Sequence, residues 1–382
     1  MEKQVNNPYL EPAFSRYLHG KAARNGIPLA GNFELTPCCN LRCKMCYVRK
    51  TPEEVRAMGG LRSTEDWIRL GEEAVEKGML FLLITGGEPM THPGFFEIYK
   101  TLHRKGVMIS VNTNGTLVDE KALEFFKENT PFRINITLYG TSAETYEALC
   151  GDGDAYNRAT RAITELCKAG ISVKVNISGT PSNGDDVTEI YDFAEKTGAK
   201  SQATFYMFPG IRRGRTFESG DRFSPEEAAQ KQVEYDLHRF GKDEFMKRAA
   251  LLKAGHVMED PERECMELPS EHIRCRAGSS AFWVTWDFKM SPCGMMTRPQ
   301  VSLAEKDFET CWQETRENTR KIMIPAKCTA CENRNNCIVC PSVCLAENDD
   351  FEKAPDYMCG MTEAYIRLTL DKAAELENEK RE

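Results

Sequence analysis

Residues 37–47 read PCCNLRCKMCY, and this segment of the 382-residue chain decides how the rest is interpreted. In it Cys39, Cys43 and Cys46 have the spacing C-x-x-x-C-x-x-C, whereas Cys38 does not keep three residues before Cys43. Three thiolates this close together can bind three irons of a [4Fe–4S] cubane, because sulfides and thiolates share the tetrahedral coordination of each iron. The fourth iron then needs another ligand. The spacing therefore predicts an iron–sulfur cluster with one iron open to a further molecule.

A second motif follows an apolar run. Residues 85–89 read TGGEP and end the predicted strand at residues 80–85. Parallel α/β barrels place their ligand-binding loops at the carboxyl ends of the strands, and glycine lets the backbone approach a ligand closely. Alone, this motif would be a simple turn. However, the cysteine segment also directly follows a strand-like run, at residues 32–36. The two motifs together therefore indicate one ligand site.

Together the two motifs resemble the signature of the radical S-adenosylmethionine (SAM) enzymes. The resemblance implies that the amino and carboxylate groups of SAM bind the open iron. It also implies that the backbone of Gly86, Gly87 and Glu88 hydrogen-bonds the SAM amino group. The implied chemistry is reductive cleavage of SAM to methionine and a 5′-deoxyadenosyl radical, which abstracts a hydrogen atom from substrate. The cofactors supply this chemistry, and the protein positions and shields them.

Three further residues are implied to contact SAM. Thr137 ends the fourth predicted strand, where the family often has a small polar residue for the ribose or carboxylate. Asn114 is either polar lining of the same site or part of an Asn-Gly turn. Met45 replaces a common aromatic residue and could pack on the adenine. The family also often has an arginine for the SAM carboxylate where this chain has Cys150, so that contact must come from elsewhere.

The fold class follows from the alternation of elements. From residue 32 to about 215, short apolar runs alternate with segments of helical periodicity, which is typical of parallel βα units. Six predicted strands are fewer than the eight of a closed barrel. The sequence therefore predicts an α/β fold with a partial (β/α)6 TIM barrel. The expected strands are 33–36, 80–85, 108–112, 133–138, 173–178 and 201–206, and two of the expected helices are 63–77, with a capping box, and 155–169.

The alternation stops after residue 215, where a charged helical stretch leads into a small cysteine-rich C-terminal domain. The last segment has helical periodicity that fades into a charged run, most simply a solvated end. The expected divisions are an N-terminal extension at 1–30, the barrel at 31–215, a helical linker at 216–264, the cysteine-rich domain at 265–360 and a C-terminal helix at 361–382.

The C-terminal cysteines are too dense for a role in packing alone, whereas Cys150, Cys167 and Cys311 have helical or apolar surroundings typical of core residues. Four such cysteines on their own would suit a structural zinc site equally well. Nine are enough for two further clusters. These nine are Cys265, Cys275, Cys293, Cys328, Cys331, Cys337, Cys340, Cys344 and Cys359.

Their layout resembles the SPASM extension of peptide-modifying radical SAM enzymes, which carries two auxiliary [4Fe–4S] clusters. The family glycine five residues before Cys293 is Phe288 here, so the hairpin turn is expected to differ. By this resemblance the outer cluster would be held by Cys328, Cys331, Cys337 and Cys359. The inner cluster would be held by Cys275, Cys293 and Cys340, with Cys344 as the alternative to Cys340. Its fourth iron would be bound by Cys265 or would be open to substrate.

Composition limits the partners. With 41% apolar and 28% charged residues the chain is globular, and it has neither a secretion signal nor an apolar run of ~18 residues for a membrane. We therefore expect a cytoplasmic protein in which most of the 16 cysteines do not form disulfides, and their clustering indicates metal binding. The net charge of −8 offers no basic surface for nucleic acid, although it could suit a basic peptide.

The resemblance implies a maturase that oxidises or crosslinks a ribosomally made peptide or protein, served by an electron donor such as flavodoxin or ferredoxin. Sulfatase-maturing relatives carry a catalytic Asp where this chain has Gly294, which disfavours that class. About 30 residues precede the first strand, too few for a leader-binding domain, so a separate recognition protein or a small non-peptide substrate is an alternative. A small molecule or tetrapyrrole substrate, or a non-catalytic electron-transfer or scaffold protein, are the alternatives, and no catalytic base is assignable.

Overall fold

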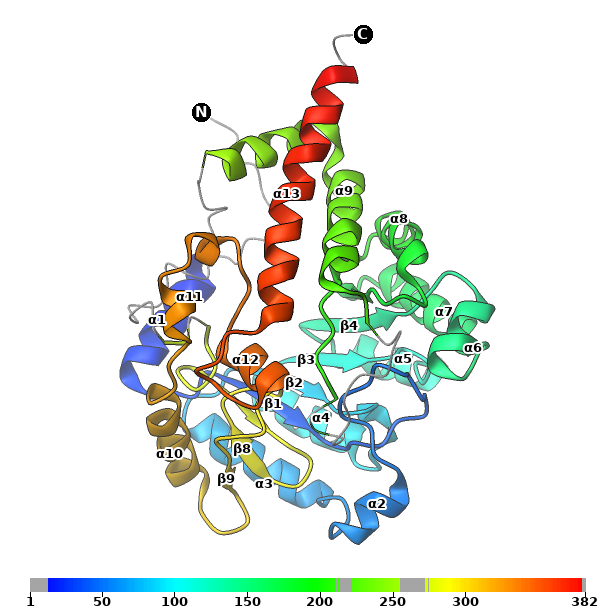
Figure 1. Cartoon of the computed structure of the whole chain (residues 1–382). Coiled ribbons are helices and arrows are strands. Elements are labelled where there is room, and N and C mark those ends of the chain that lie inside the picture. Colours follow the sequence, from blue (N-terminus) through cyan, green and yellow to red (C-terminus); the bar gives the residue numbers. More distant parts are fainter. Residues whose placement is uncertain (1–12, 211, 213–221, 255–271, 274, 380–382) are drawn as a thin grey trace, which may run out of the picture.

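The computed structural model describes residues 13–210, 212, 222–254, 272–273 and 275–379. Within them nine strands form one sheet in the order β6-β5-β4-β3-β2-β1-β7-β8-β9 (Figure 1). Neighbours from β6 through β7 are parallel, and β7–β8 and β8–β9 are antiparallel. The strands are β1 Ala30–Glu34, β2 Phe81–Thr85, β3 Met108–Thr113, β4 Arg133–Leu138, β5 Val173–Ser178, β6 Lys200–Thr204, β7 Ala281–Val284, β8 Lys289–Ser291 and β9 Val301–Ser302.

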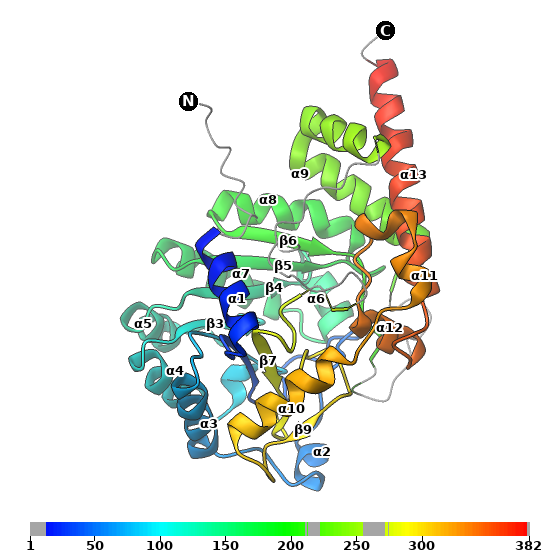
Figure 2. The ribbon, with the colours of Figure 1, turned by 90° about the vertical axis from the view of Figure 1, so that its left-hand side faces the viewer.

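Helices connect the parallel strands and cover one face of the sheet (Figure 2). The helices of the barrel part are α1 Ala13–Asn25, α2 Pro52–Ala57, α3 Thr64–Glu76, α4 Phe95–Arg104, α5 Glu120–Glu128, α6 Ala143–Cys150, α7 Ala155–Lys168 and α8 Val187–Thr197. The later helices are α9 Pro225–Lys253, α10 Phe308–Arg320, α11 Ala326–Thr329, α12 Pro341–Asn348 and α13 Asp356–Glu379. The predicted partial barrel of six parallel βα units is confirmed.

Local sequence explains how these elements begin and pack. The predicted capping box starts α3, because the Ser63 hydroxyl accepts from the Asp66 N–H and the Asp66 carboxylate accepts from the Ser63 N–H. One face of α3 is buried, with Trp67 and Leu70 in the core. A side chain at Gly71 would clash with Leu102, so this glycine allows α3 and α4 to lie close together.

The sheet continues past the predicted barrel into the cysteine-rich part. Strand β7 lies in that part of the sequence, yet it pairs in parallel with β1, from Ala30 opposite Ala281 to Phe33 opposite Val284. The core is continuous as well, because Phe33 contacts Phe282, and Phe282 in turn contacts Phe308 and Trp312. The two parts therefore share one sheet and one core.

The C-terminal segment differs from its interpretation as a solvated end. Helix α13 starts at Asp356, inside the predicted cysteine-rich domain, and packs along α9 (Figure 1). Ala373 and Leu376 are buried, and Leu376 belongs to a small core with Val233 and Phe245 of α9. The interpretation as a solvated end is therefore wrong for α13 up to Leu376. The charged residues of this helix cover the outer side of a buried helix pair.

Phe288 occupies the turn between β7 and β8 with a left-handed backbone, φ +61°. Its N–H donates to the Thr285 carbonyl, and the Thr285 N–H donates to the Lys289 carbonyl, as in hairpins that place glycine at this position. The expected difference in the turn is therefore not found in the backbone. The buried Phe288 ring packs against Trp67 at 4.8 Å between centroids, and this contact explains why a strained phenylalanine is accommodated.

We predict that Phe288→Gly is less destabilising than Phe288→Ala, by about 1 kcal/mol. Both variants lose the buried ring, which costs roughly 3–5 kcal/mol, but only glycine relieves the left-handed backbone. The midpoints of anaerobic thermal unfolding would show this order. If Phe288→Ala unfolds at the higher temperature, the turn does not impose a positive φ.

Candidate active site

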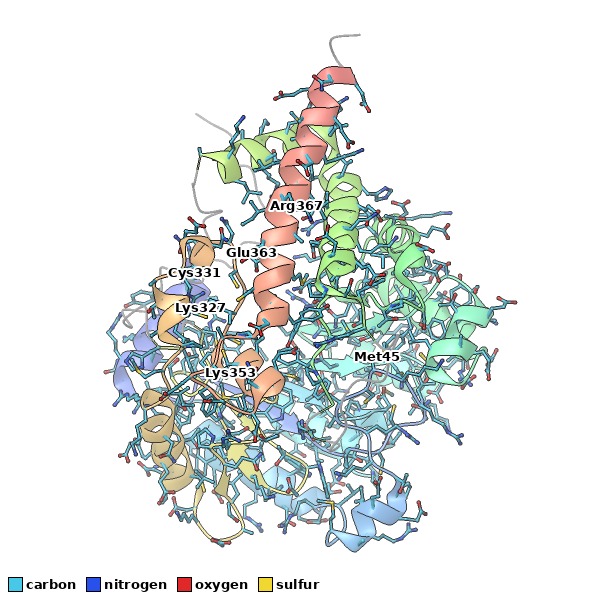
Figure 3. All side chains as sticks on the ribbon, in the orientation of Figure 1. Met45, Lys327, Cys331, Lys353, Glu363 and Arg367 are labelled. Carbon is cyan, nitrogen blue, oxygen red and sulfur yellow. The ribbon has the colours of Figure 1, made fainter. Side chains whose placement is uncertain are left out.

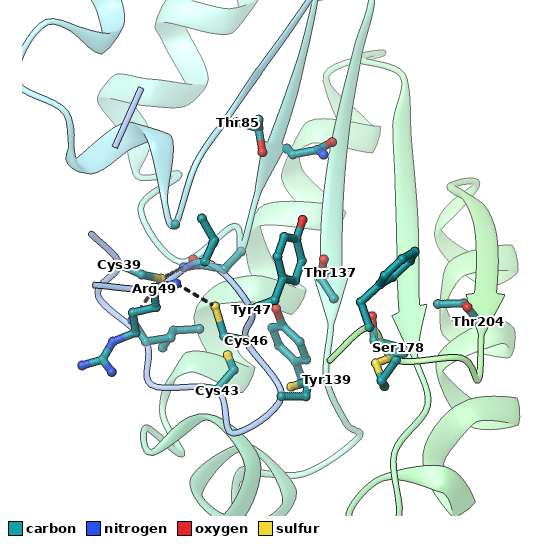
Figure 4. Close-up of a pocket in the computed structure, with 18 of the residues that line it drawn as sticks. Cys39, Cys43, Cys46, Tyr47, Arg49, Thr85, Thr137, Tyr139, Ser178 and Thr204 are labelled. Atoms are coloured by element: carbon teal, nitrogen blue, oxygen red, sulfur yellow. Dashed lines mark hydrogen bonds between the residues drawn. The ribbon is translucent and has the colours of Figure 1, made fainter. Parts of the chain in front are cut away.

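A cavity of ≈450 Å³ lies at the carboxyl ends of the parallel strands (Figure 4). The cysteine segment lines one side, and the strand ends contribute small polar side chains. The opposite side is formed by residues 206–208 and by three residues of the cysteine-rich part. The lining polar residues of β2 to β6 are Thr85, Asn112, Thr113, Thr137, Ser178 and Thr204, and the lining residues from the cysteine-rich part are Ile338, Cys340 and Val343.

The fold holds the cysteine segment in place through its backbone. The Arg42 and Lys44 N–H groups donate to the last carbonyls of α6, those of Cys150 and Leu149, at 2.8 and 3.0 Å. This anchoring leaves Cys39, Cys43 and Cys46 together at the cavity, as the sequence predicts.

The three thiols have distinct surroundings. Backbone N–H groups donate to the sulfurs of Cys39 and Cys46, each at 3.4 Å. Burial raises the pKa of Cys39 to about 12. A hydrogen bond from the Cys150 thiol lowers the pKa of Cys43, against the opposing effect of burial. Cys150 is therefore a neighbour of a predicted iron ligand. Metal binding would deprotonate all three thiols, and N–H···S bonds tune a cluster's potential.

The two glycines pack tightly on the residues that precede the cysteines. Gly87 N–H donates to the Thr36 carbonyl at 2.7 Å, and Glu88 N–H donates to the Cys38 carbonyl at 2.9 Å. A Cβ on Gly86 or Gly87 would lie 2.4 or 2.3 Å from those same carbonyl oxygens. Glycine is thus required because two backbones touch, and the N–H groups of Gly87 and Glu88 are already used.

The Glu88 side chain turns away from the cavity. Its fully buried carboxylate accepts from the Thr113 hydroxyl at 2.7 Å, the Asn114 N–H at 2.8 Å and the Met90 N–H at 3.1 Å. Burial raises its pKa despite these donors. Glu88 therefore ties the loops after β2 and β3 together, and any contact with SAM from this residue would come from its backbone.

The other predicted SAM contacts lie in the cavity wall. Thr137 and Met45 line it. Asn114 also lines it, and its side-chain amide donates to the Asn40 side chain at 2.9 Å, while the next residue, Gly115, has a left-handed φ of +78°. Both of the open interpretations of Asn114 therefore hold, since it is polar lining and starts an Asn-Gly turn.

Several lining residues were not assigned from sequence. Ser178 and Thr204 end strands, so the rule that selected Thr137 would also have found them. Tyr47, the residue directly after Cys46, also lines the cavity. Tyr206 is 5% exposed, and its hydroxyl donates to Glu347 of α12 at 2.8 Å. The stretch after β6 reaches the cavity, because Tyr206, Met207 and Phe208 line it.

The later cysteines fall into two neighbourhoods among the described residues. Burial, and after it the charges of Cys340 and Cys275, raise the pKa of Cys293 to about 12. The charges of Cys359, Cys337 and Cys331 act on Cys328 in the same way, after burial. In Figure 3 Cys331, which belongs to the group around Cys328, lies on the opposite side of α13 from Met45 of the first cysteine segment. The fully buried Cys344 lies between the two groups, and Cys265 lies outside the described residues.

Among the described residues no three His, Cys, Asp or Glu side chains converge on a point that would hold a single metal ion. Ligands of a cubane bind different irons, whereas the ligands of one zinc all lie about 2.0–2.3 Å from the same ion. The thiols of a cubane site therefore need not meet at one point.

A buried ion pair lies beside the inner group of cysteines. Glu34 of β1 is 1% exposed and the side chain of Arg212 is 11% exposed, with Nη2–Oε1 and Nη1–Oε2 distances of 2.6 and 2.7 Å. Arg212 also donates to the Gly294 carbonyl at 3.3 Å, and the Trp283 indole N–H donates to Glu34 at 3.2 Å. Residues 212–215 read RRGR, a basic sequence that by itself predicts a solvated loop, yet the Arg212 side chain is buried.

The model of the radical SAM superfamily matches residues 33–194, which contain the cysteine segment and the Gly-Gly-Glu motif. Residues 33–194 are a radical SAM domain. The family binds SAM and a [4Fe–4S] cluster, so the resemblance read from the two motifs is confirmed.

None of the described helices is both long and apolar enough to cross a membrane.

Relatives of this chain include enzymes named for two kinds of product. The chain is 26% identical over 349 residues to an AdoMet-dependent heme synthase of Methanosarcina barkeri, covering 88% of this chain and 97% of that protein. It is 31% identical over 223 residues to the subtilosin biosynthesis protein AlbA of Bacillus subtilis, covering 57% of this chain and 47% of AlbA. Other relatives include a sporulation killing factor maturation protein and a mycofactocin maturase.

Solved structures agree on the fold. Streptococcus suis SuiB bound to its precursor peptide SuiA superposes with a TM-score of 0.64, covering 94% of this chain and 82% of SuiB at 17% identity. At this identity the likeness shows the fold alone.

We predict that Gly87→Ala abolishes the SAM site. The added methyl group would displace the Cys38 carbonyl and with it the cysteine segment, so we expect SAM affinity to fall more than tenfold and iron content to drop. The control is Gly170→Ala, where φ is +75° but no atom lies within 4 Å, so it should cost about 1 kcal/mol of stability and leave both quantities unchanged. Equal losses in the two variants would contradict the steric explanation.

Proposed function

We propose that this radical SAM enzyme oxidatively modifies or crosslinks a ribosomally made peptide or protein with the help of two auxiliary [4Fe–4S] clusters. The observation that carries the proposal is the lining of one cavity. Cys39, Cys43 and Cys46 line it together with Cys340, a member of the second cysteine group. A substrate in the cavity would therefore meet both the SAM site and an auxiliary site.

The residues present fit SAM and its cluster. Three thiols on one anchored segment suit three irons of a cubane. Gly86 and Gly87 line the cavity, and backbone carbonyls there could accept hydrogen bonds from an ammonium group. Bound SAM and cluster would supply the 5′-deoxyadenosyl radical. The residues assigned to hold the cluster are Cys39, Cys43 and Cys46, and those assigned to surround SAM are Met45, Gly86, Gly87, Glu88 through its backbone, Asn114 and Thr137.

We assign one auxiliary cluster to each of the two groups of later cysteines. The charges of Cys275 and Cys340 act on Cys293, which supports Cys340 over Cys344 as an inner ligand. Cys265 stays a candidate for the fourth inner ligand. Cys328, Cys331, Cys337 and Cys359 are assigned to the outer cluster.

The charge of the cavity favours a peptide over a tetrapyrrole. Among the described lining residues Arg49 is the one cationic side chain, and it belongs to the cysteine segment. A tetrapyrrole with several carboxylates would bury negative charges without partners there, which is costly. A neutral peptide residue avoids that cost. The heme synthase relative keeps the tetrapyrrole as a second candidate, because the match covers 97% of that protein.

The sulfatase-maturing class is disfavoured by packing. A Cβ on Gly294 would lie 2.6 Å from the Trp283 indole. The Trp283 ring thus fills the space that the catalytic Asp of that class would need. The remaining partners of the proposal are a reductant such as flavodoxin or ferredoxin and a separate peptide-recognition protein.

The substrate assay compares the two candidate classes on anaerobically reconstituted enzyme with SAM and dithionite. Loss of two hydrogens from a co-expressed small peptide, detected by mass spectrometry, would support the maturase. Turnover of a porphyrin that carries carboxylates, with no change in any peptide, would favour the tetrapyrrole alternative.

We predict that the fully reconstituted enzyme holds about twelve irons and that the Cys39/Cys43/Cys46→Ala variant loses about four of them together with all SAM cleavage. Iron and sulfide counting and a 5′-deoxyadenosine assay measure both effects. Zinc in place of the additional iron would contradict the auxiliary clusters. Absence of 5′-deoxyadenosine from the loaded wild type would favour a non-catalytic scaffold.

We predict that Cys340→Ser loses about four irons, because it removes an inner ligand, whereas Cys344→Ser keeps all of them. The two residues are one helical turn apart on the same segment, so each is a matched control for the other. Iron counting that gives the reverse order would assign Cys344 to the inner cluster.

A further inference from the structure

The Glu34–Arg212 pair is unusual because both charges are buried and neither residue lines the cavity. Removing an ion pair from water is costly, and the attraction between its members often does not repay the cost. The pair therefore calls for a role other than binding SAM.

The pair lies at the inner group of cysteines. Arg212 donates to the carbonyl of Gly294, the residue directly after Cys293. Trp283 donates to Glu34, and its ring packs on Gly294, so the indole covers the same backbone. Arg212 is close enough to Cys293 to favour its thiolate form and lower its pKa, although burial outweighs this effect.

The pair is also close to one residue that lines the cavity. Tyr47, which follows Cys46 and lines the cavity, is buried, and the charges of Arg212 and Glu34 both act on it. The charges of Cys46 and Cys293 act on the same tyrosine. Tyr47 is therefore near the pair and near both cysteine sites.

We propose that the Glu34–Arg212 pair sets the reduction potential of the inner auxiliary cluster, an inference that rests on the proposed function. Reduction adds a negative charge to a cluster. A nearby guanidinium stabilises that charge and a nearby carboxylate destabilises it, and charges act strongly in a buried setting. The two members of the pair therefore pull the potential in opposite directions, and their balance fixes its value.

The test is a redox titration followed by electron paramagnetic resonance, on fully reconstituted enzyme without SAM or substrate. The inner signal is identified as the one lost in Cys340→Ser. We expect Arg212→Gln to lower the midpoint potential, Glu34→Gln to raise it, and the double variant to lie near the wild type. Arg69→Gln, which removes an exposed arginine from an ion pair on α3, should leave the potential unchanged.

A purely structural pair would not give shifts of opposite sign. Equal shifts of both single variants, or none, in chains with full iron content would overturn the inference and leave the proposed function intact. A wild type without auxiliary iron would instead overturn the proposed function. If the single variants fail to load iron, Arg212→Lys and the double variant decide, since both keep the charge balanced. A shifted potential in either would overturn the inference.

Discussion

The site depends on a contact between two backbones. The Gly-Gly turn after β2 lies against the residues that lead from β1 into the cysteine segment, so close that neither glycine has room for a side chain. Two N–H donors fix this contact, and the buried Glu88 carboxylate extends it to the loop after β3. Three loops from three neighbouring strands are thereby locked in one arrangement. A radical site needs this rigidity, because the cofactors must be held and shielded while the protein contributes little covalent chemistry.

Strand β1 connects the two cysteine sites. On one side it pairs with β2 and on the other with β7, and its last residue is Glu34. The same short strand therefore leads to the first cysteine segment, supports the hairpin that carries Cys293, and supplies the carboxylate of the buried pair. Electrostatic and packing effects at either cysteine site reach the other through very few residues.

The sequence predicted the features that depend on spacing and period. Strands β4 and β5, the capping box at Ser63 and the position of Thr137 at the cavity follow from local patterns, which are read along a few residues. The contact of Arg212 with Glu34 could not be predicted in this way, because the two residues are 178 positions apart and each alone reads as an ordinary surface charge. Phe288 violates the local preference for glycine, and only its contact with Trp67, far away in the sequence, explains it.

The continuity of the sheet makes the molecule less modular than its sequence suggests. Without β7, the backbone groups of β1 on that side would lose their partners and form an open edge, the kind of surface that pairs with other chains and aggregates. The aromatic contacts from Phe33 through Phe282 to Trp312 would be opened at the same time. Gene fusion or loss in this lineage would therefore have to preserve both parts together, and the cysteine-rich part cannot be treated as a removable accessory.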